Sequence, residues 1–289
     1  VHPAFQRASA TAINNSLGKW SSDVTGIWVA KFEASREDAT IDDIGVGTKI
    51  KSVPSVKSAV GVSASDAYDY CEDMYSTMYS HMMKNSEWGA VAYLAYSAYG
   101  EISSNRSADY ITGGGGTTSS YTTSESTFNS KYAYNVRENI GKTAGMYAST
   151  TGNIYGIYDM AGGAAEHVAT YLNNSSPVIQ SNGRSLTQTS APSLREVYSP
   201  AETDAPINNY ERNGIVDGIY GNAIYETSTG YIGSYGFEGD ASNYPTKNKP
   251  FFARGGAATD GSSSGIFSFD TSEGAANEEI SFRPVLAFR

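Results

Sequence analysis

Residues 251–289 read FFARGGAATDGSSSGIFSFDTSEGAANEEISFRPVLAFR, and this stretch decides how the chain folds. Its two ends, FFARGG and SFRPVLAFR, are apolar segments punctuated by arginine, whereas small polar residues fill most of the middle. Ile266, Phe267 and Phe269 interrupt that middle with the signal of a short strand. The pattern indicates an ordered backbone with permissive side chains, in which the ends are framework and the middle is a display surface.

The composition bounds the size and class of the protein. A chain of 289 residues with 39% hydrophobic content is long enough to bury a large core. No internal repeat or long linker divides it, so we expect a polar lead-in over residues 1–22 and one elaborated domain over residues 23–289. The combination of 22 tyrosines and 30 glycines with only 17% charged residues is typical of a loop-rich extracellular, cell-surface or virion-surface protein.

Charge, cysteine content and hydropathy argue against several classes of partner and site. The formal net charge is −10, and no cluster of Lys and Arg offers the basic face that phosphate binding needs, which excludes a nucleic-acid partner. The single cysteine, Cys71, has no partner for a disulfide or a metal cage, and we expect it to be a small buried hydrophobe. No apolar run approaches the roughly 20 residues of a membrane helix. Because the chain starts at Val1 rather than Met, the sequence is compatible with removal of a leader or anchor.

The first hundred residues contain three periodic segments. Residues 24–33 alternate in a way that predicts a core strand covered on both faces. Over residues 66–83, apolar side chains recur at spacings of three and four, which predicts an amphipathic helix capped by Ser63 or Ser65. A shorter apolar run over residues 87–96 predicts a second helix. We expect the two helices to cover one side of a sheet.

Two stretches lack periodicity and are interpreted as insertions. Residues 101–143 contain four consecutive glycines, but no Gly-Lys-Ser or Gly-Lys-Thr follows them, so a surface loop is favoured over a phosphate-binding loop. Residues 172–222 contain four prolines and are predicted to be loop-rich.

Residues 151–168, TGNIYGIYDMAGGAAEHV, form the most motif-like part of the middle of the chain. They resemble the Asn-x-x-Gly-x-x-Asp-Met-x-Gly-Asn-x-x-Glu pattern of formylglycine-generating-enzyme-like proteins, a branch of the C-type lectin fold. Gly163 stands where that pattern has Asn, and Ala165 and His167 replace flanking aromatics, so we expect different packing around this turn. The positions in register are Asn153, Gly156, Asp159, Met160, Gly162 and Glu166.

The same family opens with a strand like residues 26–33 and closes with Arg-Gly-Gly, a loop and Phe-Arg-Pro. Here RGG at 254–256 and FRP at 282–284 supply both closing elements in order. The resemblance implies an α+β chain with the C-type lectin fold of the formylglycine-generating-enzyme-like branch. We therefore expect a loop-rich domain with two helices packed on small antiparallel sheets.

The oxidase chemistry of that lineage does not fit the residues present. It uses a pair of C-terminal cysteines, or histidines that hold iron, whereas this chain has no cysteine pair and only three scattered histidines. An acid-base pair of Glu166 and His167 is disfavoured against a structural Glu166 that caps backbone amides. We expect no enzyme, no catalytic residue, no metal ligand and no cofactor. Structural calcium stays open, because C-type lectin folds often use it.

A narrower resemblance is to the variable proteins of diversity-generating retroelements. It is carried by residues 85–94, residues 150–163 and the closing motifs RGG at 254–256 and RPVL at 283–286. In that family, adenine-directed mutagenesis rewrites codons near the C-terminus, and the lectin fold displays the altered side chains as a ligand-binding face. The resemblance implies a non-enzymatic protein that binds an unknown ligand, a protein or another surface molecule, through the segment 251–289.

Residues that vary should lie where neither backbone bonding nor core packing depends on their side chains. Arg254 and Arg283 would then be framework, because an arginine can tie several carbonyls and carboxylates. Phe252, Phe269, Phe282 and Leu286 would anchor the segment from below, and Tyr231, Tyr235 and Tyr244 would add fixed aromatic contact area. The candidate variable, ligand-binding residues are Ala257, Ala258, Asp260, Ser262, Ser263, Ser268, Asp270, Ser272, Ala276 and Asn277.

Besides the disfavoured oxidase of the formylglycine-generating type, two alternatives share this fold and composition. One is a fixed receptor-binding or adhesion protein on a phage or a cell surface. The other is a polar surface loop with no ligand. Sibling copies of the gene separate both from a diversified protein, since only the latter varies at the candidate positions.

Overall fold

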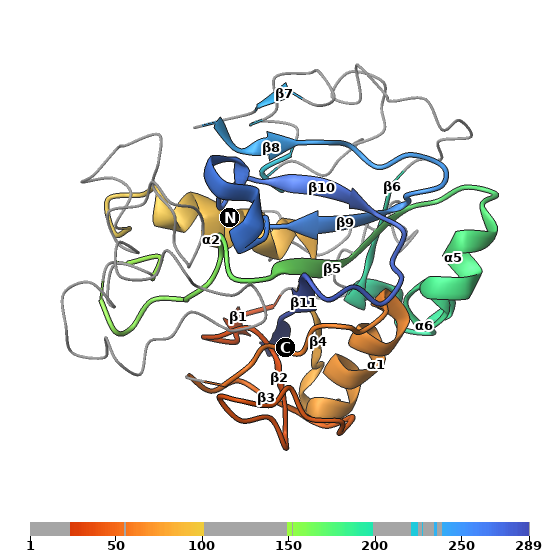
Figure 1. Cartoon of the computed structure of the whole chain (residues 1–289), viewed down its shortest axis with the longest axis horizontal. Coiled ribbons are helices and arrows are strands. Elements are labelled where there is room, and N and C mark those ends of the chain that lie inside the picture. Colours follow the sequence, from red (N-terminus) through yellow and green to blue (C-terminus); the bar gives the residue numbers. More distant parts are fainter. Residues whose placement is uncertain are drawn as a thin grey trace.

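The computed structural model describes residues 24–100, 149–198 and 241–288, apart from 55 and 152, together with 221–224, 227, 234–235 and 239–240. The lead-in over residues 1–22 and the insertion over residues 101–143 lie outside the described residues. Figure 1 shows helices arranged around sheets, which confirms an α+β chain.

A seven-stranded sheet runs through the middle of the molecule in the order β11-β5-β9-β10-β8-β7, with β6 beside β5 (Figure 1). The pairs β11–β5, β6–β5 and β10–β8 are parallel, whereas β5–β9, β9–β10 and β7–β8 are antiparallel. The expectation of purely antiparallel pairing is therefore wrong in this sheet, because segments from distant parts of the chain pair with β5 in parallel. The strands are β5 (Ala165–Leu172), β6 (Glu196–Tyr198), β7 (Ser234–Tyr235), β8 (Ala241–Ser242), β9 (Phe251–Arg254), β10 (Phe269–Ser272) and β11 (Ile280–Phe282).

A three-stranded antiparallel sheet joins the two ends of the described chain. Its order is β1-β12-β4, formed by β1 (Gly26–Val29), β12 (Pro284–Phe288) and β4 (His81–Met82). Because β1 is an edge strand, Trp28 is 69% exposed, so the prediction of a strand covered on both faces is wrong there. A separate pair is formed by β2 (Ser35–Arg36) and β3 (Ile50–Lys51).

The two predicted helices exist, but the first is shorter than predicted. Helix α1 spans Ala64–Met74, and the Ser63 side chain accepts from the Asp66 amide, which confirms the serine cap. The predicted continuation to Met83 is wrong, because the chain turns through the left-handed region at Tyr79 (φ 49°) and enters β4, where it pairs with β12. Helix α2 spans Asn85–Ala95.

The predicted loop-rich stretch 172–222 is more ordered than expected over its described part. It contains α5 (Pro177–Asn182), α6 (Arg184–Gln188), a 3-10 helix (Pro192–Leu194) and β6. Of the four prolines that suggested a loop, Pro177 and Pro192 stand in the first turns of helices, where a missing N–H costs nothing. Pro200 and Pro206 lie outside the described residues.

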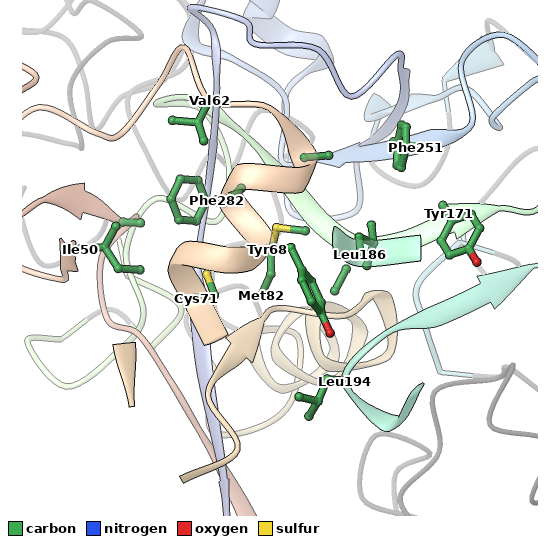
Figure 2. Packing of buried hydrophobic residues seen from close by; sticks show 14 of the residues in the cluster. Ile50, Val62, Tyr68, Cys71, Met82, Tyr171, Leu186, Leu194, Phe251 and Phe282 are labelled. Carbon is green, nitrogen blue, oxygen red and sulfur yellow. The ribbon is translucent and has the colours of Figure 1, made fainter. Parts of the chain in front are cut away.

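Apolar side chains cover both faces of the central sheet. Phe252 on β9 packs with Trp88 of α2 in one cluster, whereas its neighbour Phe251 belongs to the cluster under α1. Figure 2 shows this second cluster, whose side chains gather around α1 and include Tyr68 and Cys71 of that helix and Phe282 of β11. Burial of such side chains stabilises the fold by about 1.5–3 kcal/mol each.

Cys71 and most of the predicted anchor residues lie inside these clusters. Cys71 has no exposed surface, which confirms a buried hydrophobe, and burial raises the pKa of its thiol. Of the predicted anchors, Phe252, Phe269 and Phe282 are buried, whereas Leu286 is half-buried.

Candidate ligand-binding hollow

Arg254, at the end of β9, fixes the start of the C-terminal segment. Its side chain has no exposed surface, and its guanidinium carbon lies 5.5 Å from the ring centroid of Trp88. The guanidinium ties together three parts of the chain that are distant in sequence. It donates to Ser268 O at 2.9 Å, Asn85 Oδ1 at 3.1 Å, Asn222 O at 3.1 Å and Ala223 O at 3.2 Å.

Arg283, between β11 and β12, fixes the other end of the segment. It is fully buried and donates to Ala30 O and Tyr158 O, each at 2.9 Å, and to both carboxylate oxygens of Glu166. Burial opposes the charge of Arg283, but the carboxylates of Glu166, Glu33 and Asp159 together outweigh burial and raise the pKa of Arg283. These contacts confirm the framework role predicted for both arginines.

Glu166 itself does not cap backbone amides, and that prediction is wrong. It points from β5 to the Arg283 guanidinium. The carboxylate that accepts from a backbone amide near this turn is Glu33, whose Oε1 lies 3.1 Å from the Ala164 nitrogen. The sequence motif places Glu166 correctly but does not reveal which group faces it across the sheet.

Between the two arginines, the backbone is held by main-chain contacts. Trp88 Nε1 donates to Ile266 O at 2.7 Å, and the Phe267 amide donates to Asp240 Oδ2 at 2.9 Å. The Gly265 amide donates to Gly255 O at 3.0 Å. Because each of these bonds uses a peptide group on the segment, the path at residues 265–267 does not depend on the candidate side chains. Elsewhere the segment does use its own polar side chains, since Asp260 accepts from the Ala257 amide and Ser272 from the Gly274 amide.

A hollow of about 410 Å³ lies where this segment meets the sheet, within the range of about 300–1,000 Å³ usual for ligand pockets. Its floor includes Ala165 of β5, Ala253 of β9 and Ile280 of β11, which form a small apolar cluster. Six of the ten candidate residues line it. They are Ala257, Asp260, Ser263, Ser268, Asp270 and Asn277.

The six lining candidates differ in exposure. Asp260, Asp270 and Asn277 are exposed, whereas Ala257 and Ser268 are 3% and 1% exposed and belong to the wall. Asn277 also forms a bridge with Val62, so its backbone is fixed by the segment before α1.

The other four candidates are not part of this lining. Ser272 is buried in β10 and its hydroxyl accepts from the Gly274 amide at 2.9 Å, so it does not face the surface as expected. Ala276 is exposed outside the hollow. The backbone of Ala258 and Ser262 lies in the 3-10 helix Ala258–Ser263, and their side chains are outside the described part of the structure.

The charge around the hollow is acidic. Asp260, Asp270 and Glu279 line it, and no Lys, Arg or His is among the described lining residues. Burial raises the pKa of Asp260, and the charges of Asp270 and Glu279 raise it further, against a hydrogen bond from the Ala257 amide. The three carboxylates therefore share one electrostatic environment.

Sequence reasoning missed Glu279 and the alanine floor. Glu279 follows two residues after the candidate Asn277, and the acidic pair EE at 278–279 was the available signal. The floor alanines gave no signal, because only strand register brings Ala165 and Ala253 together. Thr271 and Asn243 were also missed, and they separate this hollow from a neighbouring one of about 400 Å³.

The tyrosines expected to flank the site do not all do so. Tyr244 is fully buried, with its ring 5.5 Å from that of Phe252 in an edge-on contact, so the expected surface role is wrong. Tyr231 and the side chain of Tyr235 lie outside the described residues.

The described histidines lie in the interior rather than in this hollow. His81 Nε2 lies 2.9 Å from Glu87 Oε1, and both residues have no exposed surface. His167 is buried in β5, and burial lowers its pKa to about 4. Within the described ranges, no group of three or more His, Cys, Asp or Glu residues is arranged to hold a metal ion.

None of the helices in the described residues is both long and apolar enough to cross a membrane. Neither a protein-family model nor a curated protein sequence matches the chain.

Proposed function

We propose that this chain is a non-enzymatic ligand-binding protein with a C-type lectin fold of the formylglycine-generating-enzyme-like branch, diversified at its C-terminal segment like the variable proteins of diversity-generating retroelements. It would be displayed on a cell or virion surface and recognise a protein or another surface molecule. One observation carries the proposal: six of the ten candidate residues line one hollow, on a segment whose ends are tied down by two buried arginines.

The way the segment is held supports this use. A diversified site needs a backbone that keeps its path when side chains change. Here Arg254, Trp88 and Asp240 bind peptide groups at 266–268, and none of these three is a candidate variable residue. Substitutions at Asp260 or Asp270 would therefore alter the lining and leave these three contacts in place.

Two reactive residue types in the described interior, a histidine and the cysteine, are held in ways that support a non-enzymatic role. His81 is engaged with Glu87, and burial raises the pKa of the Cys71 thiol, which keeps the thiol protonated and unreactive. A thiolate or imidazole at the surface hollow would favour an enzyme instead.

Genomic context tests the diversification directly. We expect a reverse transcriptase gene nearby and a second copy of the 3′ coding sequence that differs from this gene at adenines. Absence of both would refute diversification and leave the fixed receptor-binding or adhesion protein as the better explanation.

A pair of libraries tests the hollow as the binding surface. The first library randomises the six lining candidates, and the second is a control that randomises six positions elsewhere. Both libraries are displayed and selected against the same panel of proteins. We expect the first library to keep most clones folded and to yield binders that compete with one another. If it yields no more binders than the second, the hollow is not specialised for recognition.

The second library is a matched control on the other side of the fold. Five of its six positions line a different hollow of about 510 Å³ between α1 and the β2–β3 pair, and all six are exposed. These positions are Glu37, Thr48, Lys49, Asp73, Tyr75 and Ser76.

A further inference from the structure

The hollow contains a buried hydroxyl group whose bonding capacity is unused. Ser268 is 1% exposed and lines the hollow. Its carbonyl accepts from Arg254 Nε and the Gly255 amide, and its own amide donates to Gly265 O. No described residue forms a hydrogen bond with the Ser268 hydroxyl, which leaves it available to a ligand in the hollow.

The register of β10 places a carboxylate at the hollow. Asp270 pairs with Ala253, whose methyl group is part of the floor, whereas Phe269 pairs with Arg254 and packs in the core on the other face. Successive side chains of a strand point to opposite faces. Asp270 therefore points away from the core face, and Ser268, in the turn just before β10, lines the same hollow.

The three carboxylates at the hollow are oriented but not neutralised by the lining. Asp260 Oδ2 accepts from the Ala257 amide at 2.7 Å, Asp270 Oδ1 from the Thr271 amide at 2.6 Å, and Glu279 Oε1 from Thr259 Oγ1 at 3.2 Å. Each of these bonds fixes one oxygen and leaves the other able to accept from a ligand.

We propose that the hollow binds an alkylammonium group, presented by a lysine side chain of a protein partner. The ammonium would donate to the Ser268 hydroxyl and to the carboxylates of Asp260 and Asp270, with Glu279 adding charge. Its methylene chain would lie over the alanine floor. This inference rests on the proposed function, because it takes the hollow to be the contact surface.

The arrangement favours an ammonium over the other common cations. An ammonium has three divergent donors and no acceptor, which suits oxygens supplied by separate segments, whereas the flat fork of a guanidinium suits one carboxylate held in plane. A metal ion would need ligands that converge on one point, and among the described residues no three His, Cys, Asp or Glu side chains do so. A bound cation would also relieve the mutual repulsion that raises the pKa of Asp260.

A nuclear magnetic resonance titration of the full, isotope-labelled chain tests the proposal. The probe is acetyl-Gly-Lys-Gly-amide, its neutral control is the same peptide with an acetylated lysine, and calcium chloride is titrated separately. We expect the lysine peptide to shift the amide signals of Ala257, Asp260, Ser268 and Asp270, and the acetylated peptide to leave them unchanged. Equal shifts from the two peptides, or no shift from either, would overturn the proposal.

Three variants separate a specific site from the overall negative charge. Asp270→Asn should weaken binding of the lysine peptide at least tenfold, and Ser268→Ala should weaken it several-fold. Thermal unfolding would verify that both variants stay folded. Asp42→Asn removes one exposed carboxylate from the loop between β2 and β3 and should bind like the parent chain. If Asp42→Asn weakens binding as much as Asp270→Asn, the attraction is only long-range and the site is refuted.

Calcium and the libraries distinguish the remaining outcomes. Calcium that shifts the same amides at lower concentration than the lysine peptide would assign the hollow to a metal and overturn the ammonium site. If the peptide fails while the library of lining residues yields binders, the preference for ammonium is wrong and the proposed function stands. If both fail, the proposed function is refuted as well.

Discussion

Arg283 connects more of the described chain than its position near the end suggests. It reaches the segment after β1 through Ala30, the turn at Tyr158, and β5 through Glu166. A guanidinium can serve these acceptors together because its donors form a rigid fork.

Replacement of this arginine should therefore be costly. We expect Arg283→Leu to lower the free energy of unfolding by about 3–5 kcal/mol, because it leaves the Glu166 carboxylate buried and unpaired. Denaturant titration followed by circular dichroism would measure it. Arg184→Leu, at an exposed position on α6, should change stability by about 0.5 kcal/mol or less. Parent-like stability of Arg283→Leu would show that the ion pair is dispensable.

His167 makes stability depend on pH. Burial lowers its pKa to about 4, against about 6.5 in the unfolded chain, so the unfolded state binds the proton first as pH falls. The contribution of neutral His167 to the free energy of unfolding is therefore fully present above about pH 6.5. It is lost as the pH falls from about 6.5 to about 4, which lowers the free energy of unfolding by about 3 kcal/mol in all. Denaturant titrations across this range would show the slope.

The variant His167→Leu should be at least as stable as the parent at pH 7, because neither ring nitrogen of His167 has a partner among the described residues. It should also lose most of the slope between pH 6.5 and 4 and keep the parent behaviour above pH 7. An unchanged acid slope in this variant would assign the effect to other groups.

At the scale of elements, the RGG motif places two consecutive glycines in the left-handed region. Gly255 and Gly256 have φ values of 82° and 69°, which turn the chain sharply out of β9. A Cβ on Gly255 would also lie 3.0 Å from Met160 O and 3.3 Å from the Trp88 ring. Only glycine meets both demands.

Three alanine variants separate these two effects. Gly255→Ala should destabilise by more than about 2 kcal/mol, because backbone strain and a clash add. Gly239→Ala, with φ 88° but open space, should cost about 1–2 kcal/mol from strain alone, and Gly26→Ala, without strain or clash, should be neutral or slightly stabilising. Thermal unfolding ranks them, and equal costs at Gly255 and Gly239 would mean that the contact with Met160 and Trp88 relaxes freely.

Local signals predicted where elements begin, and long-range pairing decided where they end. The serine cap at Ser63 and the apolar run near Trp88 located both helices. The end of α1 was not predictable, because β4 forms only by pairing with β12 from the far end of the chain. The candidate site followed the same rule: Asp260 and Asp270 were predicted from their own segment, whereas the floor at Ala165 comes from another strand.

At the scale of the whole molecule, the C-terminal segment is structural as well as exposed. It supplies β9, β10 and β11 to the central sheet and then, after Arg283, supplies β12 to the second sheet. β12 lies between β1 and β4, so its removal separates the two other strands of that sheet.

Removal of residues 280–289 should therefore abolish cooperative folding. We expect the shortened chain to show no sharp thermal transition by near-ultraviolet circular dichroism, because it lacks β11, β12 and the buried Arg283. Addition of the missing segment as a peptide should restore a transition, and a peptide with Arg283→Leu should restore less. A sharp transition in the shortened chain alone would show that the two sheets are stable without their closing strands.

The pairing of β1 with β12 has a consequence for biosynthesis. A ribosome makes β1 among the first strands and β12 last, so neither sheet can be completed until the end of the described chain has been translated. A frameshift or premature stop within the segment 251–289 would remove β12 and expose apolar core. The cell's proteases would degrade such a product, so the fold itself would restrict the accumulated protein to copies read through in the correct frame.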